Sequence, residues 1–346
     1  MDPLKFVREN ILKLEPYSTA RDEFKGGEID VWLDANESPY NNGVNRYPDP
    51  RHKKLKAKIS QLKEVPEDMI FIGGAGSDEA IDLTYRIFCR PGKDKVLIPT
   101  PTYGVYGVAA QINDVEIVDL PLGENFSLKV EEIVLLSQKD PDIKLVWICS
   151  PNNPTGNGFS KEEILYIADN FEGIVAVDEA YVDFSTKGSL IHDIPQHPNL
   201  IVLQTFSKAW GMAALRCGMA FAVPEIASIF NNVKYPYNLN GPTQELILEM
   251  LENKPDEKVA EILREREKLA NALATLPIVN KVFQSDANFL LVEVTDPKKI
   301  YDYLVKNGVI VRNRSGVKGC GNSLRITVGT PEENSRVISL LKNYPS

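Results

Sequence analysis

The sequence predicts an α/β fold: a large domain with a mostly parallel sheet and a second, smaller α/β domain. From about residue 69, short apolar runs alternate with segments of helical period, as expected for strands that alternate with helices. Several runs are apolar throughout, which is typical of strands covered on both faces. The seven runs are 69–72, 96–98, 115–118, 145–149, 174–177, 201–204 and 219–223.

Helices are predicted between these runs. Ser160 followed by Glu163 gives one of them a capping-box start. A longer helical stretch follows at 242–276, and Pro255 is expected to break it. The earlier helices are 77–89, 103–112, 130–137 and 161–170.

A length of 346 residues suits about two domains. We expect residues 1–43 to form an N-terminal segment that packs with the small domain. The large domain is expected to span 44–275, and the small C-terminal α/β domain 276–346.

Composition excludes several classes of protein. The chain has 39 Lys and Arg against 48 Asp and Glu, with no basic block, which argues against nucleic-acid binding. Its most apolar stretch, 211–223, is too short to span a bilayer and contains Arg216. The four cysteines form no CxxC pair, so neither a metal site nor a disulfide framework is predicted. Charged residues throughout the first twenty positions do not fit a signal peptide, and a cytoplasmic location is expected.

A glycine-containing turn, Gly74-Ala75-Gly76-Ser77, follows the first predicted strand and opens a helix. A dinucleotide fingerprint needs a third glycine where Glu79 stands, so that interpretation is poor. Two interpretations stay open: a plain turn with a helix cap, or a phosphate site at a helix N-terminus.

Polar residues follow three further strands. Asn153 lies in the run Cys-Ser-Pro-Asn-Asn-Pro-Thr-Gly, Asp178 ends the next strand, and Lys208 follows Thr-Phe-Ser after the next. Arg216 comes eight residues later. Ligands of open α/β sheets bind at the carboxyl ends of strands. Each residue taken singly also has an ordinary explanation as a loop residue, a helix cap or a surface lysine.

Taken together and in this order, these motifs resemble those of the fold-type I, class II aminotransferases that use pyridoxal 5′-phosphate (PLP). Further segments resemble the histidinol-phosphate aminotransferases within that family, and the resemblance covers nearly the whole chain. It implies the PLP-dependent transferase fold, with a seven-stranded, mostly parallel sheet in the large domain. The segments are 33–39, 45–49, 149–156, 177–181, 215–218 and 324–329.

The resemblance also assigns roles to residues. Lys208 would hold PLP and move the α-proton of the substrate, and Asp178 would stabilise the protonated pyridine nitrogen. Asn153 and Tyr181 would hydrogen-bond the phenolic oxygen of the cofactor, and Tyr103 would stack on its ring. The residues implied for the cofactor phosphate are Gly76, Ser77, Asp78, Thr205, Ser207 and Arg216, with Tyr47 contributed by the neighbouring subunit of a homodimer with shared sites.

For the substrate, the resemblance implies transamination between L-histidinol phosphate and 2-oxoglutarate, giving imidazole acetol phosphate and L-glutamate in L-histidine biosynthesis. Arg325 would take the substrate phosphate, and Arg312, Tyr17 and Asn36 are further candidates near it. Arg314 is close in sequence and can replace Arg312 in this role, but a solvated loop charge is the favoured interpretation.

Three alternatives remain. Threonine-phosphate decarboxylases and broad aromatic aminotransferases share the fold, Lys208 and Asp178. Segments 45–49 and 324–329 favour histidinol phosphate over both. A non-enzymatic sensing module of a transcription regulator is disfavoured, because the N-terminal segment of about 40 residues shows no helix-turn-helix pattern.

Overall fold

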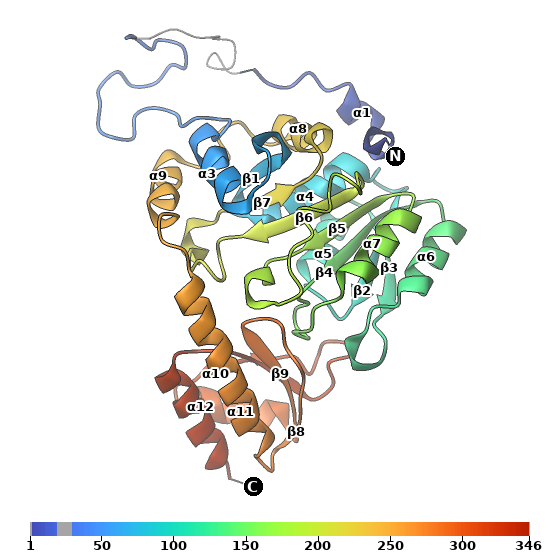
Figure 1. Ribbon diagram of the computed structural model, residues 1–346, viewed down its shortest axis with the longest axis vertical. Coiled ribbons are helices and arrows are strands. Elements are labelled where there is room, and N and C mark those ends of the chain that lie inside the picture. Colours follow the sequence, from blue (N-terminus) through green and yellow to red (C-terminus); the bar gives the residue numbers. More distant parts are fainter. Residues whose placement is uncertain (1, 19–29, 346) are drawn as a thin grey trace.

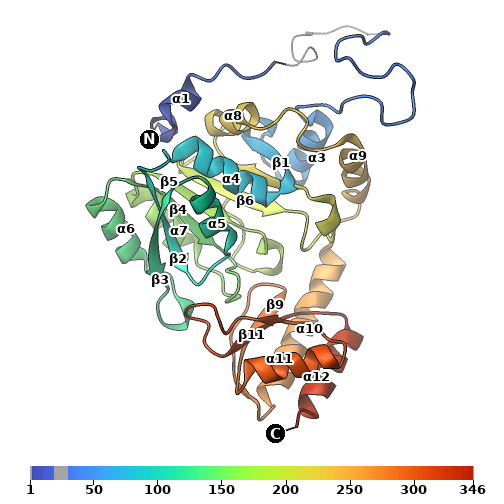
Figure 2. The same ribbon diagram turned by 180° about the vertical axis from the view of Figure 1, so that it is seen from behind.

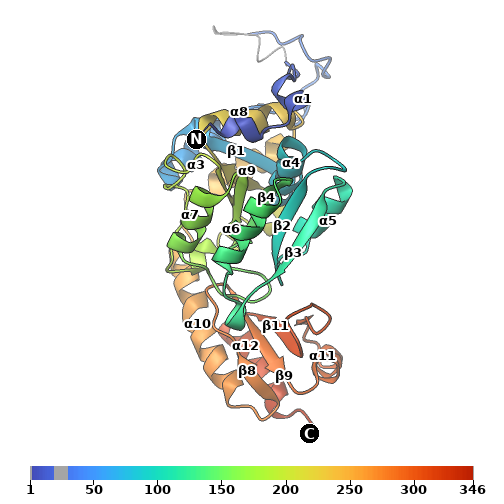
Figure 3. The ribbon, with the colours of Figure 1, turned by 90° about the vertical axis from the view of Figure 1, so that its right-hand side faces the viewer.

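The computed structural model describes residues 2–18 and 30–345. They form a large and a small α/β part, one beyond the other along the long axis of the molecule (Figure 1, Figure 3).

The large part is built on a sheet of seven strands in the order β1-β7-β6-β5-β4-β2-β3. Only β7 is antiparallel to its neighbours, β1 and β6, so the prediction of a mostly parallel seven-stranded sheet is confirmed. Every residue of β5 and β6 is buried, which explains their continuously apolar sequences. The strands are β1 (Ile70–Gly76), β2 (Lys95–Thr100), β3 (Glu116–Pro121), β4 (Ile143–Cys149), β5 (Ile174–Asp178), β6 (Leu200–Thr205) and β7 (Gly218–Phe221).

Helices cover both faces of this sheet. α6 and α7 lie on the face turned to the viewer in Figure 1, and α4 and α5 lie on the opposite face in Figure 2. The predicted capping box starts α7: the Glu163 N–H donates to the Ser160 hydroxyl (3.2 Å) and the Ser160 N–H to the Glu163 carboxylate (2.8 Å). The helices are α3 (Lys53–Lys63), α4 (Ser77–Phe88), α5 (Val105–Ile112), α6 (Val130–Lys139), α7 (Lys161–Asn170), α8 (Pro224–Val233) and α9 (Gly241–Met250), with 3₁₀ turns η2 (Glu67–Met69), η3 (Glu124–Phe126), η4 (Val182–Phe184) and η5 (Ala213–Leu215).

The small part has its own antiparallel sheet, β10-β11-β9-β8, and its own core. Leu269 and Leu273 of α10 belong to that core together with Leu290 and Val292 of β9. The start of α10 packs on the large part, where Val259 and Leu263 lie against Tyr181 and Phe184. α10 therefore connects the two parts, and the boundary at residue 275 stays a prediction. Its elements are α10 (Asp256–Ala274), β8 (Val279–Val282), β9 (Phe289–Val294), α11 (Pro297–Lys306), β10 (Arg312–Asn313), β11 (Ser323–Thr327) and α12 (Pro331–Lys342).

The N-terminal segment begins with η1 (Pro3–Phe6) and α1 (Glu9–Leu12). Val7 packs into the core of the large part, and the Arg8 N–H donates to the Ile87 carbonyl oxygen (2.9 Å). In Figure 1 these residues lie at the end of the molecule opposite the small part. The expectation that the segment packs with the small domain is therefore wrong for them; residues 19–29 lie outside the described residues.

Within the described part of the chain, no helix combines the length and the apolar character needed to cross a bilayer.

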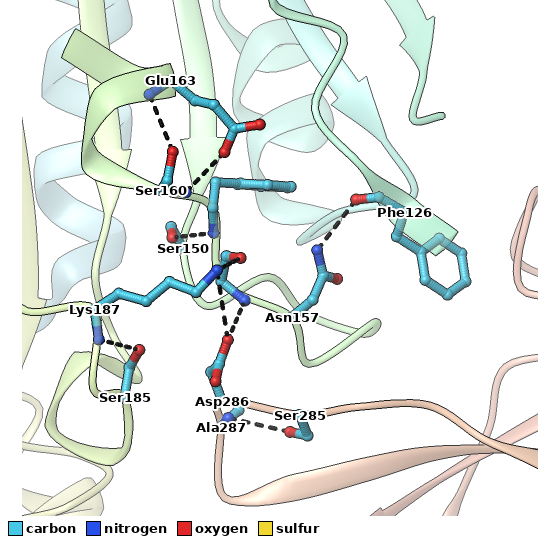
Figure 4. A network of polar contacts seen from close by, with 12 residues as sticks. Phe126, Ser150, Asn157, Ser160, Glu163, Ser185, Lys187, Ser285, Asp286 and Ala287 are labelled. Atoms are coloured by element: carbon cyan, nitrogen blue, oxygen red, sulfur yellow. Dashed lines mark hydrogen bonds and ion pairs between the residues drawn. The ribbon is translucent and has the colours of Figure 1, made fainter. Parts of the chain in front are cut away.

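Hydrogen bonds join the two parts at the loop that precedes α7 (Figure 4). The Asp286 carboxylate accepts from the Gly158 N–H (2.9 Å), and the Asp286 N–H donates to the Gly156 carbonyl oxygen (2.7 Å). Lys187 of the large part donates to the Gly158 carbonyl oxygen (2.5 Å) and lies 4.0 Å from the Asp286 carboxylate. Gly156 has φ +87°, and a Cβ there would meet the Ser285 hydroxyl at 2.7 Å. The close approach of the two parts therefore depends on glycine at this position.

Asp286→Ala should lower the free energy of unfolding by about 1–3 kcal/mol, because it removes a carboxylate that accepts a hydrogen bond at the seam between the two parts. The measurement is urea denaturation followed by far-ultraviolet circular dichroism. Asp302→Ala is the matched control: it breaks an exposed ion pair with Lys298, for which we expect about 0.5 kcal/mol. Equal midpoints for the two variants would contradict the role of Asp286.

Candidate active site

A cavity of about 440 Å³ lies between the large and the small part. The carboxyl ends of β1, β2, β4, β5 and β6 meet at this edge of the sheet because the strands are parallel. Both parts contribute side chains, and thirteen of the residues expected at the site line one cavity. These are Gly76, Ser77, Asp78, Tyr103, Asn153, Asp178, Tyr181, Thr205, Ser207, Lys208, Arg216, Arg312 and Arg325.

Asp178 ends β5 and is only 3% exposed. Its carboxylate accepts from the Tyr106 hydroxyl (2.7 Å) and from the Ala180 N–H (3.0 Å). Burial raises the pKa of Asp178, and these two hydrogen bonds oppose that rise. The site therefore holds a buried carboxylate whose ionised form is partly stabilised and which has room for a cationic partner.

Sequence reasoning did not identify Tyr106. It is fully buried, and its ring stacks on Trp147 with a centroid separation of 4.8 Å. It lies three residues after Tyr103, in the first turn of α5. Tyr103 itself precedes α5, and the two rings meet edge to face with a centroid separation of 5.5 Å. The closeness of Tyr106 to Tyr103 in the sequence is the signal that could have identified it.

Lys208 follows β6 after a short turn, in which the Ser207 N–H donates to the Thr205 hydroxyl (3.1 Å). Its amine lies 5.5 Å from the centre of the Tyr181 ring. Burial lowers the pKa of Lys208, Arg325 lowers it further, and Asp178 acts in the opposite direction. A lysine of this kind loses its proton more readily than a surface lysine and can act as a nucleophile or base.

The start of α4 forms a cradle with Arg216. The Arg216 guanidinium donates to the Ala75 carbonyl oxygen (2.9 Å) and lies 3.5 Å from the Asp78 carboxylate. Gly76, at φ +75°, admits it, since a Cβ there would meet Arg216 Nη2 at 2.9 Å. A helix N-terminus beside a guanidinium is suited to a phosphate group. Glu79 has a different task from the glycine of a dinucleotide fingerprint: it accepts from the Gly74 N–H (2.5 Å) and closes the turn.

Asn153 and Tyr181 lie together at the floor of the cavity. The Asn153 amide donates to the Tyr181 hydroxyl (3.3 Å), and its carbonyl oxygen accepts from Arg325 Nη1 (2.5 Å). Burial raises the pKa of Tyr181, which keeps the phenol protonated and able to donate a hydrogen bond. Tyr103 donates to Asp78 (3.3 Å), and burial raises the pKa of Tyr103 to about 12.

Three arginines enter the cavity from the small part. Arg312 in β10 pairs with Arg325 in β11, and Arg314 lies two residues beyond Arg312. Arg314 also lines the cavity and is partly buried. The favoured interpretation of Arg314 as a solvated loop charge is therefore wrong, because the strand pairing of β10 turns its side chain toward the site.

Tyr17, Asn36 and Tyr47 do not line this cavity within one chain. Tyr17 is 73% exposed. Tyr47 is 48% exposed, and its ring stacks on Tyr237 at 4.4 Å. Asn36 and Tyr47 instead line a separate hollow that includes Asn240. The assignment of Tyr17 and Asn36 to the substrate therefore stays a prediction, and Tyr47 lies where it can face another molecule.

Comparison with known proteins agrees with this geometry. A family model for aminotransferases of class I and II matches residues 19–341. A histidinol-phosphate aminotransferase of Bacteroides fragilis is 49% identical over 342 residues, 98% of each chain. The crystal structure of the histidinol-phosphate aminotransferase from Clostridium acetobutylicum has a TM-score of 0.79 and 25% identity, covering 86% of this chain and 90% of that one. The corresponding enzyme of Sinorhizobium meliloti, solved in complex with pyridoxal-5′-phosphate, shares the fold at 20% identity, with a TM-score of 0.79 and 86% and 82% of the two chains covered. The expected family is thereby confirmed: this chain belongs to the class I and II aminotransferases.

Proposed function

We propose that the chain uses PLP to transfer the amino group between L-histidinol phosphate and 2-oxoglutarate, giving imidazole acetol phosphate and L-glutamate in L-histidine biosynthesis. The observation that carries the proposal is that arginine side chains line the cavity around Lys208 at two separate places. Arg216 stands beside the start of α4, and Arg312, Arg314 and Arg325 come from the small part. Arg216 is suited to the cofactor phosphate, and the three arginines of the small part are suited to an anionic substrate.

The residues present fit PLP. The glycine at position 76 leaves the start of α4 open beside Arg216, and Ser77, Thr205 and Ser207 place hydroxyl groups around the same end of the cavity. Asp178, buried and already accepting two hydrogen bonds, is the anionic partner for a protonated pyridine nitrogen. When bound, PLP supplies an electron-withdrawing ring that stabilises negative charge on the substrate α-carbon.

Lys208 has two roles in this proposal. Its amine holds the cofactor covalently, and once displaced by the substrate amine it takes the proton from the α-carbon. The lowered pKa of Lys208 suits both roles, because the amine must be unprotonated to attack and to accept a proton. Asn153 and Tyr181 donate hydrogen bonds to the phenolic oxygen of the cofactor, and Tyr103 covers its ring.

Half-reactions with a set of amino donors test the proposal. Histidinol phosphate should react with a kcat/KM at least about tenfold above that of histidinol, because the phosphate gains charge-assisted hydrogen bonds. The measurement is the single-turnover change in cofactor absorbance, with Lys208→Ala as the inactive control. Faster decarboxylation of threonine phosphate would move the assignment to a threonine-phosphate decarboxylase. Aromatic amino acids that react as fast as histidinol phosphate would move it to a broad aromatic aminotransferase.

Asp178→Asn should keep some PLP but reduce kcat by about a thousandfold or more, because a neutral amide does not stabilise a protonated pyridine nitrogen.

Tyr106→Phe should act through Asp178. Loss of the hydrogen bond raises the pKa of the carboxylate, so the acidic limb of the pH–rate profile should move to higher pH, with a loss of about tenfold at low pH.

Tyr85→Phe is the matched control for Tyr106→Phe. It removes a buried hydroxyl that donates to the Tyr106 carbonyl oxygen (2.8 Å) but does not touch Asp178. Its pH profile should match that of the wild type. The same profile in both variants would refute the effect of Tyr106 on Asp178.

We further infer a homodimer with shared sites, in which Tyr47 reaches the cofactor phosphate bound by the neighbouring subunit. Its position outside the cavity of its own chain and its exposed ring support this assignment. The four cysteines are buried and unpaired, which suits a reducing cytoplasm, where we place the protein.

A mixture of Lys208→Ala and Tyr47→Phe subunits should recover activity, because one of the two sites in a mixed dimer is then free of both changes. Activity is measured after the subunits are unfolded and refolded together. A mixture of Lys208→Ala and Asp178→Asn subunits is the control, since both residues serve the same chain's cavity and no intact site forms. Equal activity of the two mixtures would exclude a contribution of Tyr47 across the interface.

A further inference from the structure

The wall of the cavity formed by the small part is positively charged and lacks acidic partners. Arg46, Arg86, Arg90 and Arg216 each form an ion pair with a carboxylate. Arg312, Arg314 and Arg325, which all line the cavity, form none within residues 2–18 and 30–345. Three neighbouring cations without a carboxylate repel one another, so this wall is suited to a ligand with more than one negative charge.

The position of Arg314 is fixed by a backbone hydrogen bond and by the partial burial of its side chain. Its N–H donates to the carbonyl oxygen of Ser323 (2.9 Å), the first residue of β11. Its side chain is partly buried, and its Nε atom is buried without a hydrogen-bond partner in the described part of the chain. The Nε atom of Arg325 is in the same situation. A buried donor left without an acceptor costs free energy, and an anionic ligand in the cavity would remove that cost.

The three arginines are not equivalent. Arg325 donates to Asn153 and so is committed in part to the floor of the cavity. Arg312 is exposed to solvent, which weakens its interaction with any anion. Arg314 is more enclosed than Arg312, and its side chain makes no hydrogen bond or ion pair within residues 2–18 and 30–345 that a ligand would have to break. Burial and the two neighbouring arginines lower the pKa of Arg314, yet a guanidinium stays charged.

We propose that Arg314 binds the phosphate group of the substrate and determines the preference for phosphorylated over unphosphorylated amines. This inference rests on the proposed function, since it names the group that the amino donor presents to the small part. It assigns to Arg314 a larger share of phosphate recognition than to the exposed Arg312. Because a phosphate dianion offers three acceptor oxygens, it can bind Arg314 and Arg325 at the same time.

The test compares Arg314→Gln with Lys318→Gln. Lys318 lies on the same segment and carries the same charge, but it is exposed and pairs with Asp119 (2.8 Å). In Arg314→Gln, kcat/KM for histidinol phosphate should fall about tenfold or more, mainly through KM, while that for histidinol changes less than about threefold. Arg314→Lys should recover part of the loss, and Lys318→Gln should resemble the wild type. Equal losses with both donors, or equal effects of the two Gln variants, would overturn the proposal.

A second measurement does not depend on the identity of the donor. Inorganic phosphate should inhibit the glutamate half-reaction of the wild-type holoenzyme, in which bound cofactor already fills the cradle at α4. Its inhibition constant should rise about tenfold in Arg314→Gln and stay unchanged in Lys318→Gln. If the wild type does not transaminate histidinol phosphate, the proposed function fails, and the phosphate inhibition still decides the role of Arg314. An unchanged inhibition constant would refute that role.

Discussion

The buried carboxylate of Asp178 is the constraint around which the large part is organised. An ionised carboxylate in such an environment is unstable by several kcal/mol unless donors and a cation surround it. The Tyr106 hydroxyl and the Ala180 N–H supply two donors, and the stacking of Tyr106 on Trp147 ties one of them to the core of the sheet. The cation is left to the ligand. The packing of the core therefore fixes the position of the carboxylate, and the carboxylate favours a ligand that places a cationic group beside it.

The second constraint is the seam between the two parts. Without it the arginines of the small part would have no fixed distance from Lys208. The Asp286 contacts hold the seam beside the loop that leads from Asn153 to α7, and Arg325 crosses it to reach Asn153. The same asparagine thus contacts Tyr181 on one side and Arg325 on the other. In the proposed function, this one side chain would connect substrate recognition by Arg325 with cofactor binding.

The sequence predicted those features of the fold and the site that depend on the local pattern of apolar residues and motifs. The seven apolar runs became the seven strands of the large sheet, and motifs placed after strands came together because parallel strands end at one edge. What it could not predict depends on packing between distant elements. The sequence of α5 does not show that Tyr106 contacts Asp178. The sequence around Arg314 does not show that β10 pairs with β11 and brings this residue to the cavity. The amphipathic pattern of α10 also does not show that its end packs in the core of the small part while its start packs on the large part.

These features divide the chemistry between the two parts. In the proposed function the large part supplies the amine, the carboxylate and the cradle, which would serve any reaction that leaves an electron pair on the α-carbon after loss of a proton or of a carboxyl group. A transaminase and a decarboxylase can therefore share those residues, and identity at Lys208 and Asp178 carries no information about the substrate. The small part supplies three guanidinium groups without a carboxylate partner in the described residues, and an anionic substrate would neutralise their positive charge. In this proposal, a phosphorylated amine is preferred because its phosphate relieves the repulsion among the three arginines. Changes in β10 and the loop after it can then alter substrate preference, while the residues at the strand ends of the large sheet stay the same.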